Sequence, residues 1–175
     1  MDCDVAVPVG IVVSREKLDH PWDEILWRPV SVLLDPPAKA LWREVGRSRE
    51  CVHYHAANLT LVLDRRCVMH YRVNLANGIP SLYVVVRQRP GAGSDVPIDV
   101  TRVSISPFEI DAHGSDASEH VVRVPMPPAL VEMVQRFIDE TAETEPRIAP
   151  RARAEKFGGG FAPMVGFSGQ LSPGK

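Results

Sequence analysis

The chain has 175 residues, the length of one ordinary domain, and 45% of them are hydrophobic, so a core can form without disulfides or metal. Its 20 basic and 22 acidic residues give a formal net charge of −2. This balance excludes the strongly positive field that attracts nucleic acid or anionic lipid.

The cysteines and the N-terminus indicate a compartment. Cys3, Cys51 and Cys67 are an odd number without CxxC spacing, and the first residues, MDCDVAV, carry two acids where a secretion signal would be basic. Both features predict a protein of the reduced cytoplasm. The longest apolar runs, such as Leu82–Val86, are much shorter than the ~20 residues of a membrane helix, which predicts a soluble protein without membrane insertion.

Two strands are expected in the first part of the chain. Apolar residues alternate over Val5–Val13, and Pro8 removes one ladder donor, which favours an edge strand or a bulge over a central strand. We expect this strand at the border of the sheet, where its edge could also support a homodimer. A second extended run follows over Leu26–Leu34, interrupted by Pro29. The sequence Asp35-Pro36-Pro37 then predicts the start of a short helix that stops at Gly46.

The segment from Cys51 to Leu63 predicts a strand with a change of phase. Its first apolar residues stand at even positions, and those from position 59 stand at odd positions. One extra residue in a bulge near Ala57-Asn58 would bring both sets to one face of a sheet. The residues Asp64-Arg65-Arg66 are then expected to form a short hairpin connection.

Two further strands are expected over Cys67–Leu75 and Pro80–Arg87. Alternation over Cys67–Leu75 is strict, since every second residue is apolar, and Asn77-Gly78 is a turn signal. Together with the preceding segment these runs predict three strands in meander order.

The last elements follow a loop over Arg89–Pro97. Extended stretches are expected over Asp99–Ser106 and Val121–Val124. An amphipathic helix is then expected over Pro128–Thr141, with apolar residues at helical spacing. These elements predict an α+β fold with a mostly antiparallel sheet, curved or partly closed into a barrel, and one C-terminal helix that covers it. Residues 1–144 are expected to form a single domain, and residues 145–175, rich in Pro, Gly and Arg, a flexible tail.

One polar face is a candidate ligand site. In the predicted pairing, imidazole, guanidinium, amide and thiol groups share one sheet face: Cys51, His53, His55, His70, Arg72 and Asn74. Cys51, His53 and His55 are weak metal candidates, because zinc accepts sulfur and nitrogen ligands but CxHxH lacks a second ligand pair. An ordinary solvated sheet face is the more frequent origin of such a pattern.

Arginines and aromatic residues offer further candidates. Arg28, Arg72 and Arg87 suit an anion site or, more commonly, cross-strand ion pairs. Trp22 and Trp27 suit partner binding, although core packing explains tryptophans more often. Aromatic residues among glycines in the tail also suggest docking: Phe157, Phe161 and Phe167. No catalytic motif is found, so we expect neither an enzyme nor a cofactor.

Four sequence blocks carry a resemblance to a known family: VGIVVSREKLDHPWDEILWRPVSVLL, YHAANLTLVLDRR, YRVNLANGIPSLYVVVR and VPMPPALVEMVQRFID. In this order they resemble an uncharacterised bacterial family of unknown function, encoded beside molybdenum-dependent formate dehydrogenase subunits and their maturation proteins. The resemblance covers about residues 5–145. It implies a noncatalytic accessory protein in assembly, maturation or regulation of that enzyme, with a subunit or maturation factor as partner. The alternative is a small-ligand or metal-binding protein that uses the polar His/Arg face.

Overall fold

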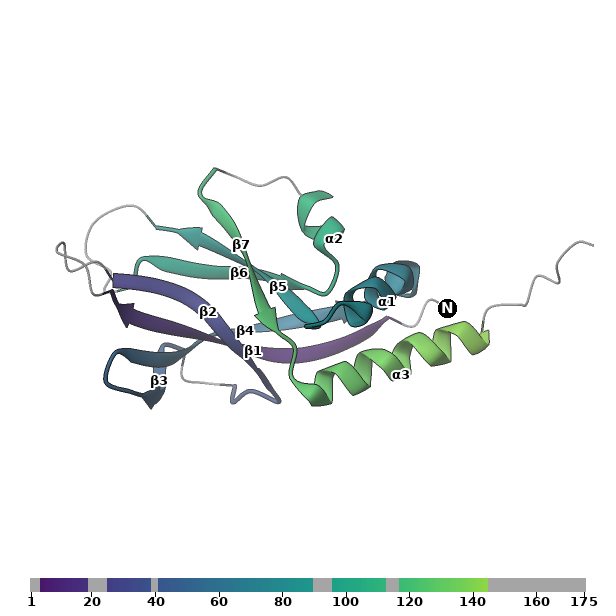
Figure 1. The fold of residues 1–175 in the computed structure, drawn as a ribbon, viewed down its shortest axis with the longest axis horizontal. Helices are drawn as coiled ribbons and strands as arrows, with labels where there is room; N and C mark the ends of the chain where they lie inside the picture. Colours follow the sequence, from purple (N-terminus) through teal and green to yellow (C-terminus); the bar gives the residue numbers. More distant parts are fainter. Residues whose placement is uncertain (1–3, 19–24, 39–40, 90–95, 113–116, 145–175) are drawn as a thin grey trace, which may run out of the picture. The chain divides into compact units, whose positions relative to one another are not determined.

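The computed structural model describes residues 4–18, 25–38, 41–89, 96–112 and 117–144. They form two antiparallel sheets, one of four strands in the order β2-β1-β4-β3 and one of three strands in the order β6-β5-β7 (Figure 1). The strands are β1 (Val5–Lys17), β2 (Ile25–Leu34), β3 (Arg43–Arg47), β4 (Cys51–Leu63), β5 (Ser81–Gln88), β6 (Ile98–Ser104) and β7 (Glu119–Pro125). The helices are the 3-10 turn η1 (Arg65–Cys67), α1 (Val68–Ala76), α2 (Pro107–Ala112) and α3 (Pro128–Thr144).

The predicted fold class is confirmed, with sheets that are curved but not closed. Buried side chains of both sheets and of the helices α1 and α3 form one hydrophobic cluster. Ile11 of β1, Val84 of β5 and Leu130 of α3 belong to it, each 0% exposed. Burying a side chain of this size contributes about 1.5–3 kcal/mol, so this shared cluster stabilises the arrangement of sheets and helices.

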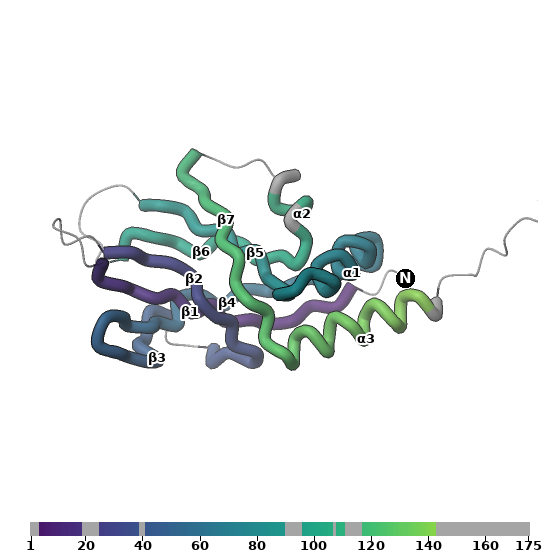
Figure 2. The backbone as a smooth tube through the Cα atoms, in the orientation of Figure 1, coloured from purple at the N-terminus to yellow at the C-terminus, as the bar shows by residue number. Residues whose placement is uncertain are grey.

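The helix α3 confirms the expected C-terminal helix. Leu130, Val134, Phe137 and Ile138 are buried at helical spacing, and they belong to the shared cluster. The backbone tube in Figure 2 shows α3 leaving the end of β7. The hydroxyl of Thr141 donates a hydrogen bond to the carbonyl of Phe137, so this buried polar group is satisfied inside the helix.

The prediction that β1 is an edge strand is wrong. β1 lies between β2 and β4, so its edge is not available for a homodimer over Val9–Lys17. Pro8 is tolerated because pairing with β2 begins only at Val9, which leaves Pro8 with β4 as its one neighbour.

The predicted bulge in β4 is present one residue before the expected position. Ile11 pairs with Ala57 and Val12 pairs with His55, so Ala56 is the extra residue. Ala56 and Leu61 are consequently both buried, as the change of apolar phase requires.

The predicted strand over Cys67–Leu75 is wrong, because the segment forms the helix α1. Asp64 caps the preceding 3-10 turn by accepting a hydrogen bond from the N–H of Arg66, and Asn77 ends α1 at its C-cap. The Asn77-Gly78 signal therefore marks a helix end rather than a hairpin. Neither the hairpin nor the three-strand meander forms.

The predicted helix between Asp35 and Gly46 is also wrong for the described residues. Arg43–Arg47 form the strand β3, which pairs with β4. Just before this strand Trp42 has φ = 61°, a left-handed conformation that interrupts any right-handed helix. None of the helices in the described ranges is long and apolar enough to cross a membrane. The predicted tail, 145–175, lies outside these ranges.

Candidate functional site

The four-stranded sheet brings Cys51 and His53 together. The sulfur of Cys51 lies 3.3 Å from Nε2 of His53 and 3.1 Å from the hydroxyl of Ser48. Both side chains extend from the same face of β4, because they stand two residues apart in a strand. The arrangement joins a half-buried thiol to one imidazole and one hydroxyl.

A carboxylate on β1 lies beside this pair. Ser14 pairs with His53, and Glu16 with Cys51, in the register of β1 and β4. The carboxylate of Glu16 accepts a hydrogen bond of 2.8 Å from the hydroxyl of Ser14 and one of 3.0 Å from the guanidinium of Arg28. The Ser14 hydrogen bond, followed by Arg28, holds the pKa of Glu16 below its ordinary value, so Glu16 is the anion of the group.

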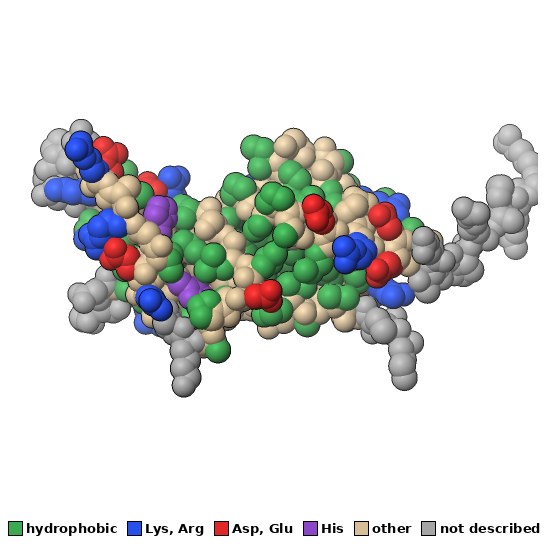
Figure 3. Space-filling view, turned by 90° about the horizontal axis from the view of Figure 1, so that it is seen from below, with side chains coloured by type: hydrophobic (Ala, Val, Ile, Leu, Met, Phe, Trp, Pro, Cys, Tyr) green, Lys and Arg blue, Asp and Glu red, His purple; other side chains and the backbone are tan. Residues whose placement is uncertain are grey.

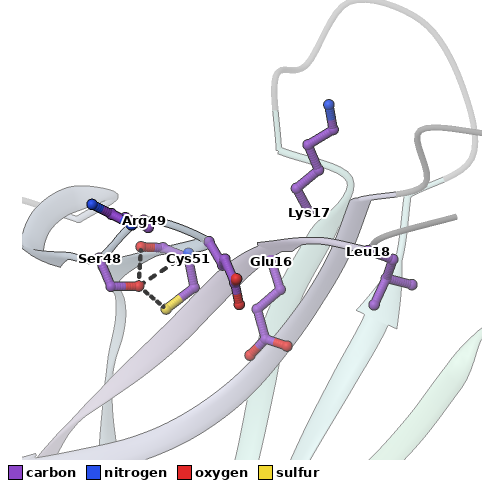
Figure 4. A pocket seen from close by; sticks show the side chains of 7 residues that line it. Glu16, Lys17, Leu18, Ser48, Arg49 and Cys51 are labelled. Atoms are coloured by element: carbon purple, nitrogen blue, oxygen red, sulfur yellow. Dashed lines mark hydrogen bonds between the residues drawn. The ribbon is translucent and has the colours of Figure 1, made fainter.

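Glu16 and Cys51 border an open hollow of about 790 Å³ (Figure 4). Its other lining residues are Lys17, Leu18, Ser48, Arg49 and Glu50. The labelled side chains in Figure 4 come from the end of β1 and the residue after it, and from the turn between β3 and β4 and the first residue of β4. Groups of both charges line the hollow, which therefore has no single electrostatic preference.

His55 does not join the Cys51–His53 pair in a metal site. It is 1% exposed, and its Nε2 lies 2.6 Å from the side-chain oxygen of Asn58. The side-chain nitrogen of Asn58 donates a hydrogen bond to the carbonyl of Pro37. The described part of the chain holds no group of three His, Cys, Asp or Glu residues that could bind a metal ion. His55 and Asn58 instead connect β4 to the segment that precedes β3.

The other members of the predicted polar face lie on α1, so the six residues do not share one face. The Nδ1 of His70 is 2.9 Å from the hydroxyl of Ser106, and the centre of its ring is 4.9 Å from the ring centre of Phe108. Asn74 is buried and Arg72 is exposed. The predicted face depended on a strand, and the helix distributes these side chains around its axis instead.

The ion-pair interpretation is confirmed for two of the three arginines. Arg28 pairs with Glu16, and Arg87 pairs with Glu119 across β5 and β7. Among the described residues no ion pair engages Arg72, which stands exposed on α1. A shared anion site of the three arginines therefore does not form.

The structure describes one of the five predicted partner-binding residues. Trp27 is half-buried and stacks on Tyr54, so packing explains part of its role. Trp22 lies in the range 19–24, outside the described residues. The same holds for the aromatic residues of the tail, Phe157, Phe161 and Phe167.

Sequence reasoning missed an exposed surface on α1. We call Met69, His70, Arg72, Val73 and Phe108 the α1 surface. Met69 and Val73 are 64% and 62% exposed one helical turn apart, and Phe108 of α2, 61% exposed, contacts His70. Ile79, 63% exposed, follows the helix, and these four are the most exposed large hydrophobic side chains of the described chain. A signal was present, since residues 65–80 contain three arginines and no acid.

The space-filling view in Figure 3 shows another face of the molecule for comparison. Hydrophobic side chains lie over the middle of that face, with charged side chains toward both ends. The histidine side chains visible there lie toward the end that carries β3.

Comparison with known proteins gives a family and no activity. Residues 8–151 match the model of a family described as protein of unknown function (DUF3305). No curated protein and no solved structure matches the chain.

Proposed function

The chain belongs to the DUF3305 family of proteins of unknown function, and we propose that it is a noncatalytic protein-binding accessory of a molybdenum-dependent formate dehydrogenase. In this proposal it acts in assembly, maturation or regulation of the enzyme. The resemblance of its sequence blocks supports the setting, and the α1 surface supports the binding role.

The exposure of Met69 and Val73 is the observation that carries the binding role. The buried side of α1 is complete without them, because Val68 and Tyr71 already join the core from the opposite side. Large apolar side chains gathered on one exposed surface indicate an interaction site. A partner that covers Met69 and Val73 would gain the burial free energy that the fold leaves unused.

Charge adds selectivity to this surface. Arg72 stands beside Met69 and Val73 on the exposed side, and residues 65–80 contain no acid that could neutralise it. The whole chain is nevertheless slightly acidic, with net charge −2. A local positive charge around apolar anchors favours a partner with acidic side chains around an apolar groove.

Affinity capture of the full-length tagged protein from its native cytoplasm, under formate-utilising conditions, tests the proposal. Wild type is compared with Met69→Glu/Val73→Glu and with a matched control, Val45→Glu/Val62→Glu, whose residues are 51% and 48% exposed elsewhere. We expect wild type and control to recover formate dehydrogenase components, and the α1 variant to recover about tenfold less. If wild type recovers no such component, the proposed role with formate dehydrogenase is contradicted. If Met69→Glu/Val73→Glu recovers as much as wild type, binding through the α1 surface is contradicted.

A second candidate function is small-ligand binding at the hollow beside Cys51. The contact between Cys51 and His53 favours it, because a thiol and an imidazole are both ligand-binding groups. Mass spectrometry of freshly purified protein under native conditions tests this candidate. A stoichiometric bound mass that is lost in Cys51→Ser and retained in Cys67→Ser would support it, and an unchanged apo mass would reject it.

A further inference from the structure

A recess of about 410 Å³ lies at one end of the four-stranded sheet, apart from the α1 surface and from the hollow at Cys51. It is lined by Arg15, Trp27, Trp42, Tyr54 and Val96. The ring of Trp27 stacks on Tyr54, with 5.7 Å between the ring centres, and it meets Trp42 edge-on, with 6.0 Å between the ring centres. All five lining residues are half-buried, so aromatic surface stays accessible inside the recess. Its volume lies in the range of small-molecule sites.

The backbone of Trp42, whose side chain forms one wall of the recess, is strained. Its φ of 61° is uncommon for any residue other than glycine, and rare for a bulky one. The N–H of Trp42 donates a hydrogen bond of 2.5 Å to the carbonyl of His55, which fixes the turn before β3. Such outliers persist where the surrounding structure imposes them, and they concentrate at ligand sites. Here the strained residue contributes one wall of the recess.

Arg15 gives the recess a positive charge that no described carboxylate neutralises. Its guanidinium lies over the ring of Trp27, 5.8 Å from the ring centre, and Trp27 is also its cross-strand neighbour. Among the residues that the structure describes, no carboxylate lines the recess and no ion pair engages Arg15. Other arginines of the two sheets, such as Arg28 and Arg87, are paired with glutamates. A half-buried guanidinium that no described carboxylate engages can bind an anionic ligand.

We propose that this recess binds a small molecule whose aromatic ring carries a carboxylate or another oxyanion. The ring packs against the indole of Trp42 and the other aromatic side chains, since offset and edge-on aromatic contacts are both favourable. The oxyanion accepts hydrogen bonds from Arg15, whose planar fork matches a carboxylate. This site is independent of protein binding at α1 and of any chemistry at Cys51.

Two probes of the same shape separate the aromatic contribution from the charge. The full-length protein, labelled with nitrogen-15, is titrated with 2-naphthoate and with neutral 2-naphthamide, while the indole N–H signals of its three tryptophans are followed by NMR. We expect naphthoate to shift the signals of Trp27 and Trp42. Naphthoate is expected to bind about tenfold more tightly than naphthamide, the gain typical of a charge-assisted hydrogen bond.

Arg15→Gln assigns this preference to the guanidinium. It is expected to bind both probes equally weakly, whereas Arg43→Gln, which removes an exposed charge on β3, is expected to keep the wild-type preference. Thermal unfolding monitored by circular dichroism verifies that both variants are folded, and Arg15→Met, which also removes the charge, replaces Arg15→Gln if the latter is not. The inference is overturned if naphthoate leaves both indole signals unmoved, if naphthamide binds as tightly, or if the folded Arg15 variant retains wild-type affinity.

Discussion

The side-chain amide of Asn74 and the backbone of Ser81 exchange two hydrogen bonds. The amide nitrogen donates to the carbonyl of Ser81 at 2.7 Å, and the amide oxygen accepts from the N–H of Ser81 at 3.0 Å. A third bond, of 2.8 Å, goes from the same nitrogen to the carbonyl of Ile105. Asn74, 2% exposed, thus connects the end of α1 to both β5 and the segment after β6.

Asn74→Ala is expected to lower the free energy of unfolding by about 2–4 kcal/mol, because it leaves buried backbone groups of Ser81 and Ile105 without partners. Chemical denaturation followed by far-UV circular dichroism measures the change. The matched control is Asn77→Ala, an exposed amide three residues further on, for which we expect a change within about 0.5 kcal/mol. Equal midpoints for the two variants would refute a structural role for Asn74.

Gly10→Ala is expected to destabilise the protein through a direct clash. A Cβ atom at this position would lie 2.7 Å from Cβ of Pro36 and 2.9 Å from Nε2 of His55. Forcing an extra methyl into such packing costs about 1–3 kcal/mol. Gly46→Ala is the control, because its nearest neighbour would be 3.8 Å away. The same denaturation experiment should show a large loss in the free energy of unfolding for Gly10→Ala and little change for Gly46→Ala. The reverse order would contradict the close packing around Gly10.

Glu119 is expected to make stability depend on acid pH. Hydrogen bonds from Arg87 and then Arg102 hold the pKa of Glu119 below its ordinary value of 4.5. A lowered folded-state pKa contributes stability above pH 4.5, and this contribution is lost as the pH falls through the folded-state pKa. Glu119→Gln should therefore be less stable than wild type near pH 7, with the difference disappearing in acid. Glu132→Gln, at an exposed position of α3, is the control, and an equal pH profile for both variants would argue against the network.

The two described cysteines are expected to differ in reactivity. Burial, and then a hydrogen bond to Glu109, raise the pKa of the Cys67 thiol to about 12. At pH 8 its thiolate fraction is then about 1 in 10⁴, whereas Cys51 is half-buried beside the open hollow. Alkylation with iodoacetamide, mapped by peptide mass spectrometry, should modify Cys51 well before Cys67. In urea the two rates should converge, and faster modification of Cys67 in the folded protein would contradict this assignment.

The strands that could be predicted are those whose apolar runs supply core residues. In β1 the alternating residues Val7, Val9, Ile11 and Val13 are all buried, the apolar run of β5 is mostly buried, and in α3 the apolar stripe is the buried stripe. The bulge in β4 was also predictable, because one inserted residue restores a common apolar face.

The helix α1 could not be predicted from its pattern, because its apolar residues do not all serve the core. Its buried residues Val68 and Tyr71 have helical spacing, but the exposed Met69 and Val73 fill the alternate positions and imitate a strand. Local rules fail most often where a sequence also serves function. The failure at α1 therefore coincides with the surface that we propose for partner binding, and it explains why the predicted His/Arg face did not form.

The central claim, that the α1 surface contacts a protein of the formate dehydrogenase system, is tested most directly by site-specific photo-crosslinking. The photoreactive residue p-benzoylphenylalanine replaces Met69, or Val45 as a control, in the native host during growth on formate. Cross-linked peptides from position 69 are predicted to belong to a formate dehydrogenase subunit or maturation factor, in a segment rich in acidic residues, with none from position 45. Absence of an adduct at position 69, or the same adducts at both positions, would contradict the claim.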